Sequence, residues 1–205
     1  MGFEWTPRQF VGGAVCLDFA NTVTYPADPA RRYDRIESAT DLRRWAASAN
    51  DFALRGDGEG EIAARGIPDA RAFVARARRL RDCVDELFRP LAAGHSPPAA
   101  ALRELLGLYR AALEEAGSQL ELSEVGLAPQ AARGTRLAFR ALIAHSAVRL
   151  AFSPRLERLK ACPSCHWLFV DRSKSGRRLW CDMLTCGNRA KARRRYRRER
   201  SGGPG

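Results

Sequence analysis

Four cysteines near the C-terminal end constrain the fold of this chain more than any other feature. Cys162, Cys165, Cys181 and Cys186 lie within 25 residues and follow the pattern C-x2-C-x15-C-x4-C. Two cysteines separated by two residues can supply adjacent corners of a tetrahedral zinc site from one tight turn. In a chain without a secretory signal, such a cluster favours a metal over disulfides. We therefore predict one structural zinc ion, with chance cysteines or a redox pair as the alternative.

The spacing of the two cysteine pairs also predicts local structure. The 15 residues between them are enough for a β-hairpin, with strands at 167–170 and 178–180 and a turn at 173–176. Cys186 would then stand in the first turn of a helix. A knuckle, a hairpin and a helix make a treble-clef finger. Four protein ligands close the site, so no metal-bound water and no hydrolytic chemistry are expected. His166 is an alternative ligand, although a solvated imidazole suits its position better.

Positive charge is concentrated around the same cysteines. The chain has 35 basic and 23 acidic residues, and its formal net charge is +12. Residues 160–200 contain 13 of the basic and 3 of the acidic residues, which is a net charge of +10 in about one fifth of the chain. This asymmetry indicates a polyanionic partner for the C-terminal end.

Residues 187–200 are predicted to form a helix that is basic on every side. Without an apolar stripe it has no face to pack on a core, so we expect a frayed tail that becomes ordered among phosphates. The predicted nucleic-acid contacts are Arg189, Lys191, Arg193, Arg194, Arg195, Arg197, Arg198 and Arg200 on the helix, and Arg172, Lys174, Arg177 and Arg178 at the hairpin tip. A solvated tail or a contact with an anionic membrane surface is the alternative, although the latter lacks an apolar face. Asn188 and Arg189 stand so close to Cys186 that we expect them to support the zinc site, Asn188 on backbone and Arg189 near a thiolate.

The region before residue 154 has mainly helical patterning, with a small β element. Apolar residues recur at helical spacing from about Asp69 to Pro90, from Pro97 to Ala116, from Thr135 to Phe152 and, over a shorter stretch, from Asp41 to Ala49. Residues 119–125 alternate like a strand of a small hairpin, and residues 55–66 are typical of a loop. Ser153-Pro154 ends the last helix. The expected domains are thus 1–153 and 154–200, followed by a disordered tail at 201–205.

Asp18 and Asn21 are the polar residues of interest in the first domain. They lie one helical turn apart among apolar neighbours. A half-buried carboxylate must find hydrogen-bond donors. The two side chains could line a ligand pocket, or they could cap or cross-link local backbone, and the pattern favours the structural role.

Two segments carry a resemblance to known families. The run Cys186-Gly187-Asn188-Arg189, with Trp180-Cys181 and Phe169-Val170-Asp171 upstream, resembles the CGNR-type zinc finger. The segment GGAVCLDFANTV (12–23) is similar to the opening motif of the ABATE domain, which precedes that finger in bacterial proteins. The resemblance implies a treble-clef finger that binds DNA and an N-terminal domain that senses an unidentified ligand, as in a stress-linked transcription regulator.

Together these features lead to one expected function and several alternatives. We expect a cytoplasmic, zinc-dependent transcription regulator that binds duplex DNA, without enzymatic activity. One finger offers little contact area, so a homodimer would help specificity. No apolar stretch is long enough for a membrane span, and the N-terminus lacks the features of a signal peptide. An RNA- or ribosome-associated protein, a zinc-stabilised protein-interaction module and an enzyme with a catalytic N-terminal domain are the alternatives.

Overall fold

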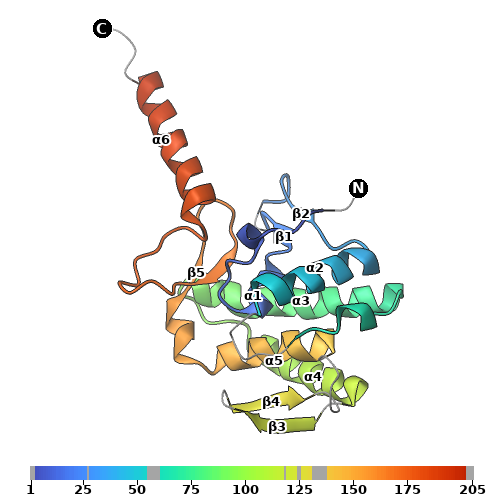
Figure 1. The fold of residues 1–205 in the computed structure, drawn as a ribbon. Coiled ribbons are helices and arrows are strands. Elements are labelled where there is room, and N and C mark those ends of the chain that lie inside the picture. Colours follow the sequence, from blue (N-terminus) through green and yellow to red (C-terminus); the bar gives the residue numbers. More distant parts are fainter. Residues whose placement is uncertain are drawn as a thin grey trace.

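The chain folds into a helical body from which one long helix projects (Figure 1). A computed structural model describes residues 3–26, 28–54, 61–117, 119–123, 126–130 and 138–201. The helices of the body are α1 (Val15–Ala20), α2 (Ala39–Phe52), α3 (Arg71–Ala92), α4 (Ala99–Ala116) and α5 (Phe139–Ala151). Short helical turns occupy Pro7–Gln9, Ala64–Gly66 and Pro154–Arg158. The mainly helical class predicted from the sequence is confirmed.

Helix α1 lies at the centre of the body, and all six of its residues are buried. It packs against α3 and α5, and also against a strand of the C-terminal finger. The rings of Phe19, Trp45 and Phe139 meet in the core with centroids 5.0 to 5.8 Å apart, two of the three pairs edge to face. Such pairs each contribute roughly 0.5–1.5 kcal/mol beyond the burial of their area. Three helices far apart in the sequence are thereby joined through one aromatic contact.

Two helix boundaries that were predicted from a proline, the end of α3 and the start of α4, differ from the prediction. Helix α3 continues through Pro90 to Ala92, so this proline neither ends the helix nor stops the last turn from forming. Helix α4 starts at Ala99 after Pro98, two residues later than the predicted start at Pro97. Gly117 ends α4 in the left-handed conformation, with φ of 58°, as expected of a C-terminal glycine.

One helix is longer than predicted, and some predicted segments lie partly outside the described residues. Helix α2 spans 14 residues because Ser38 caps its start in a capping box with Asp41. The predicted start of the last body helix, Thr135, and residues 55–60 of the predicted loop lie outside the described residues, as do residues 202–205 of the predicted tail. Ser201, placed in that tail, is the last residue of the projecting helix.

In the part of the chain that the structure describes, the strands form three separate antiparallel pairs. These are β1 (Val23–Thr24) with β2 (Tyr33–Asp34), β3 (Gln119–Ser123) with β4 (Gly126–Gln130), and β5 (Leu159–Ala161) with β6 (Leu168–Val170). The β3–β4 hairpin confirms the predicted strand over residues 119–123, and residues 124 and 125 of that prediction lie outside the described residues. The buried pair Arg81–Asp34 attaches the β1–β2 hairpin to α3 with two hydrogen bonds of 2.7 and 2.8 Å.

The hairpin predicted inside the finger is wrong in its second strand. Strand β6 forms where it was expected, but it pairs with β5, which precedes the first cysteine, and not with residues 178–180. Leu159, Leu168 and Val170 of this pair belong to the main hydrophobic core. Burial against α1 and α3 therefore decides the pairing, and the finger shares its core with the helical body.

Candidate metal centre and basic helix

The first cysteine pair lies on a tight turn that follows β5. The amide of His166 donates to the Cys162 carbonyl at 2.8 Å, and the Cys162 amide donates to the Trp167 carbonyl at 2.8 Å. His166 closes the turn in the left-handed conformation, with φ of 63°. Its carbonyl accepts a hydrogen bond from Arg89 of α3 at 2.9 Å. His166 thus shapes the turn, and its side chain lies outside the group of ligands that the described residues bring together.

The second pair lies at the start of the projecting helix. A π-helical turn, Met183–Gly187, runs directly into α6 (Asn188–Ser201). Asp182 caps this turn by accepting from the Leu184 amide at 3.0 Å and from the Thr185 hydroxyl at 2.9 Å. Cys186 is held in this first turn, as predicted.

All four sulfurs come together in one buried cluster. Every pair of Sγ atoms lies within 4.8 Å, with Cys165 and Cys181 3.5 Å apart and Cys181 and Cys186 3.7 Å apart. Tetrahedral zinc with bonds of about 2.3 Å requires sulfurs roughly 3.8 Å apart. The donor set and its spacing therefore fit one zinc ion. Trp167 and Phe169 complete the small core around the sulfurs.

The thiols of this cluster shift one another's pKa in opposite directions. Hydrogen bonds among the thiols, led by the one with Cys162, raise the pKa of Cys165 and Cys181. Hydrogen bonds from the other three, led by Cys165, lower the pKa of Cys162. Four neighbouring sulfurs cannot all ionise without a counter-charge. A divalent cation supplies it, since thiolates bind metal in the deprotonated form.

The segment between the pairs is organised by an ion pair between buried Asp171 and half-buried Lys160, which sequence reasoning missed. Asp171 is fully buried and accepts from Lys160 Nζ at 2.8 Å and from the amides of Ser173 and Arg178 at 2.9 and 2.8 Å. These bonds, with the Lys160 contact first, hold the pKa of Asp171 well below its usual range. Lys160 also donates to the carbonyls of Gly176 and Arg178. The loop is therefore closed around one charge pair in place of the predicted hairpin.

Asn21 connects the finger to the helical body. Its side chain accepts from the Leu168 amide and donates to the Leu168 carbonyl, both at 2.9 Å. Close by, the Trp167 indole donates to the Val23 carbonyl at 3.1 Å. The sequence favoured a role on local backbone over ligand binding, whereas Asn21 cross-links to backbone that is 147 residues away.

Asp18 orders the glycine segment that precedes α1. Its carboxylate accepts from the Gly12 amide at 2.7 Å, and Gly12 in turn accepts from the Val170 amide at 2.8 Å. The carbonyl of Gly13 accepts from the guanidinium groups of Arg155 and Arg172. Gly13 has φ of 77°, which permits this close approach. The Asp18 side chain is thus hydrogen-bonded to backbone, as the Asn21 side chain is.

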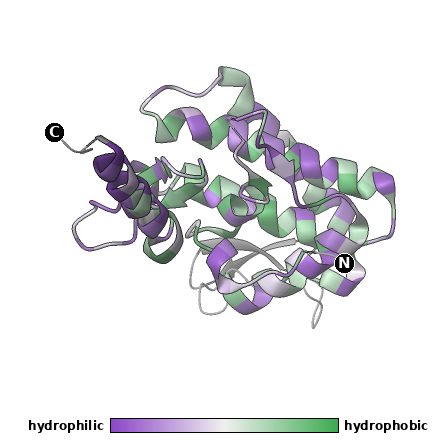
Figure 2. Ribbon diagram, turned by 90° about the horizontal axis from the view of Figure 1, so that it is seen from above, coloured by the Kyte–Doolittle hydropathy of each residue, from purple (hydrophilic) through white to green (hydrophobic). Residues whose placement is uncertain are grey.

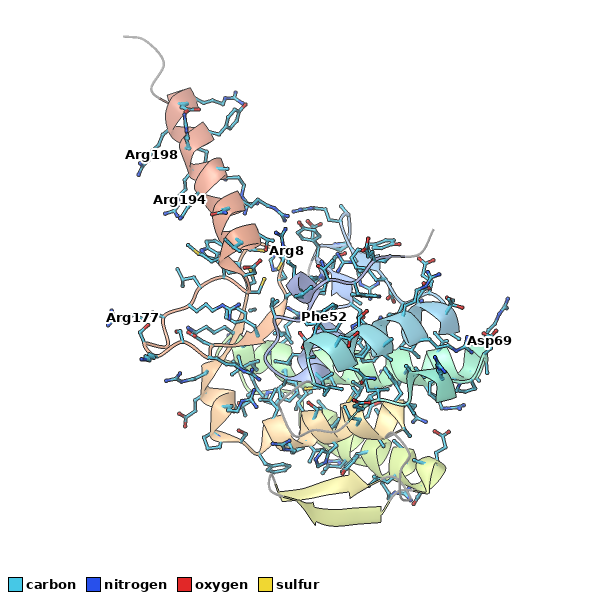
Figure 3. All side chains as sticks on the ribbon, in the orientation of Figure 1. Arg8, Phe52, Asp69, Arg177, Arg194 and Arg198 are labelled. Atoms are coloured by element: carbon cyan, nitrogen blue, oxygen red, sulfur yellow. The ribbon has the colours of Figure 1, made fainter. Side chains whose placement is uncertain are left out.

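Helix α6 leaves the body after its first turn. Ala190 is its last buried residue, and every residue from Lys191 to Arg200 is exposed. In Figure 2 this helix is hydrophilic along almost all of its length, and in Figure 3 Arg194 and Arg198 point away from the body. The expected frayed tail is instead a helix that continues to Ser201. Arginine is a good helix former, and the Arg195–Glu199 pair adds support at spacing i,i+4.

The basic residues predicted as contacts fall into two groups. Some are held by the protein itself: Arg178 donates to the Trp180 carbonyl and lies over Phe169, and Arg193 donates to the Ser164 hydroxyl. Arg189 contacts the hydroxyl of Tyr25 at 3.0 Å, a partner that was not foreseen, whereas Asn188 bonds the Leu184 carbonyl as expected. The exposed residues are Arg172, Lys174, Arg177, Lys191, Arg194, Arg195, Arg197, Arg198 and Arg200, and some of these also have protein partners, such as the Gly13 carbonyl for Arg172 and Glu199 for Arg195. Arg177 lies at the outer end of the loop in Figure 3.

Two family models match the chain, one for each part of the structure. The CGNR zinc finger matches residues 158–199. The ABATE family, described as "Putative stress-induced transcription regulator", matches residues 13–154. No curated protein matches the chain. Among the residues that the structure describes, none of the helices has both the length and the apolar character needed to cross a membrane.

Proposed function

Because the chain belongs to the ABATE family and carries a CGNR zinc finger, we propose that it is a transcription regulator that binds duplex DNA through α6. The zinc ion holds the finger and sets the direction of the helix. The helical body supplies the regulatory part, as a sensor of a small ligand or as a homodimer contact. The protein acts in the cytoplasm and has a binding role rather than an enzymatic one.

One observation carries this proposal: α6 extends into solvent with eight basic residues and one acid between Asn188 and Ser201. The ten residues from Lys191 to Arg200 are all exposed, and seven of them are basic. These positive charges repel one another in water and gain favourable contacts among phosphates. The helix starts from a buried cysteine cluster, so its base is fixed relative to the body. A rigid basic rod of this kind suits the groove and backbone of a duplex better than a flat surface.

Binding through phosphates predicts a steep dependence on salt. If about five phosphates are neutralised, the logarithm of the association constant falls with the logarithm of salt concentration at a slope of about −4 to −5. Titrations of labelled duplex DNA at several salt concentrations measure this slope. Structured RNA at matched salt tests the alternative target, and tighter binding to RNA would assign the protein to that class.

A matched pair of variants tests whether α6 is the contact. Replacing Lys191, Arg194 and Arg198 together by Gln removes three exposed charges of α6 and should make the slope shallower by up to about 3. Replacing Arg44, Arg65 and Arg103 by Gln removes three exposed charges of the helical body. The second variant should bind almost as the parent does. Equal losses in the two variants, or a flat salt dependence in the parent, would reject α6 as the DNA contact.

A further inference from the structure

A groove runs along one side of α6 where the helix leaves the finger. Its volume is about 490 Å³. Its lining combines apolar surface from the finger with arginines from the helix, and consists of Pro163, Leu179, Trp180, Ala190, Arg193, Arg194 and Arg197. No acidic side chain contributes to this lining. An aromatic ring and three guanidinium groups therefore face the same space.

The arrangement follows from helical spacing and from two contacts that hold the walls. Ala190, Arg193, Arg194 and Arg197 stand at i, i+3, i+4 and i+7, so they form one face of α6. Arg193 is fixed by its hydrogen bond to Ser164, on the turn between the first two cysteines. Trp180 is half-buried against the cysteine cluster and packs beside Gly187, where a Cβ would lie 3.3 Å from the indole. The groove is thus built on the finger and does not depend on the exposed end of the helix.

We propose that this groove binds an unpaired nucleobase, stacked on Trp180, while the flanking phosphates bind the three arginines. The proposal rests on the proposed function: α6 contacts the backbone of a duplex, and the groove at its base takes a nucleotide that is unpaired or unstacked beside that duplex. Proteins that bind single strands combine an aromatic platform with a positively charged track. Arginine adds favourable interactions with both the phosphate and the face of the base.

Charge complementarity selects a nucleotide over an apolar peptide. Every charged group lining the groove is a guanidinium, so the occupant must carry anionic groups beside a flat apolar part. A nucleotide strand carries a phosphate next to every base. A polyanion that lies along α6 would also contact the groove, because one face of α6 forms part of the groove lining. An acidic peptide with an aromatic residue also combines anionic groups with a flat apolar ring, but without the regular alternation of a nucleotide strand. It serves as the competitor in the test.

The test uses the full-length zinc-loaded protein and three probes of matched length. The first is a thymidine strand of about 16 nucleotides, a length at the upper end of common site sizes. The second is the same strand with abasic sites in place of the bases, and the third is a duplex. The abasic strand keeps the phosphates and loses the rings. We expect it to bind roughly 5- to 150-fold more weakly than the thymidine strand, the range for loss of one stacked base. This comparison needs no protein variant, so it does not depend on how a mutant folds.

A spectroscopic signal locates the contact. Trp180 is half-buried, whereas Trp5, Trp45 and Trp167 are each at most 8% exposed. Stacked bases should therefore quench mainly Trp180, and the abasic strand should quench much less. Trp180→Phe should keep most of the binding, whereas Trp180→Leu should reduce the preference for the thymidine strand over the abasic one. Tyr196→Leu removes an exposed aromatic of α6 that does not line the groove, and it should leave that preference unchanged.

The outcomes separate this proposal from the proposed function. If no probe binds, the nucleic-acid function itself fails. If duplex and abasic strands bind as tightly as the thymidine strand, the function stands and the stacking site is overturned. The site is also overturned if an acidic peptide containing phenylalanine displaces the thymidine strand from the protein and relieves the Trp180 quenching at a concentration lower than that of the strand. Zinc content and thermal stability are measured for each variant, so that loss of the finger is recognised.

Discussion

The Asn21 side chain forms two hydrogen bonds with the backbone of Leu168, 147 residues away in the sequence. One bond satisfies the Leu168 amide and the other its carbonyl, so the asparagine takes the place of a neighbouring strand. Asn21 is 3% exposed and Leu168 is fully buried, which leaves no water to replace these bonds. The finger and the helical body are therefore joined through polar contacts as well as through a shared core.

Removing the Asn21 side chain should destabilise the whole protein. Asn21→Ala leaves a buried amide and a buried carbonyl without partners, at a cost of about 1–3 kcal/mol for each group. We expect a loss of roughly 3 kcal/mol in the free energy of unfolding, measured by urea denaturation. Asn188→Ala is the matched control, since it removes one exposed hydrogen bond, and should cost less than about 1 kcal/mol. Similar losses in both variants would show that the contact with Leu168 contributes little.

Gly13 should tolerate a side chain less well than another glycine of the same conformation. Gly13 and Gly94 have φ of 77° and 78°, so alanine is strained at either position, by about 1 kcal/mol or more. A Cβ at Gly13 would also lie 3.2 Å from Arg172 Nε, whereas a Cβ at Gly94 meets nothing within 4 Å. Thermal unfolding should therefore show a larger loss for Gly13→Ala than for Gly94→Ala. Equal losses would mean that Arg172 moves aside at no cost.

Zinc binding should require the clustered cysteines and not the isolated ones. Cys186→Ser replaces one ligand of the four-sulfur cluster and should abolish stoichiometric zinc, measured by elemental analysis of purified protein. Cys83→Ala, at a buried cysteine of α3, should retain one zinc ion per chain. Because β6 contributes to the main core, a chelator should also lower the unfolding temperature of the helical body. Unchanged stability after removal of zinc would contradict this coupling.

Acid should weaken the protein through Asp34. Burial alone would raise the pKa of this carboxyl, but the hydrogen bonds and charge of Arg81 lower it below its ordinary value of 3.8. The folded protein thus binds this proton more weakly than the unfolded chain. The stabilisation is present above pH 3.8 and is lost as the pH falls through the lower pKa of the folded state.

A charge-neutral variant isolates this effect. Asp34→Asn should flatten the fall in stability below pH 4, and at pH 7 it should cost about 3 kcal/mol because the buried Arg81 loses its partner. Glu199→Gln removes an exposed pair with Arg195 and should change stability by less than about 1 kcal/mol. Urea unfolding from pH 3 to pH 7 measures both variants. An unaltered pH profile in Asp34→Asn would assign the acid sensitivity to other carboxylates.

Features that depend on neighbouring residues could be predicted from the sequence. The spacing of the four cysteines predicted the cluster that the structure brings together, because two short turns fix each pair. Apolar periodicity predicted the helices, and Gly117 and Ser38 occupy the capping positions at which such residues are favoured. The basic composition of residues 187–200 predicted a segment without a buried face, and α6 stays exposed beyond Ala190, although the free segment was expected to be frayed.

Features that depend on contacts between distant segments were decided by tertiary structure. Strand β6 could pair with either flanking segment by local rules, and burial of Leu159 beside Val170 selected β5. The carboxylate of Asp171 and the amine of Lys160 gave no signal of pairing, because only the folded loop brings them within 2.8 Å. The groove beside Trp180 likewise exists only where two cysteine turns and α6 meet. Spacing along the chain fixes local geometry, but the choice among competing partners depends on which of them the core can bury.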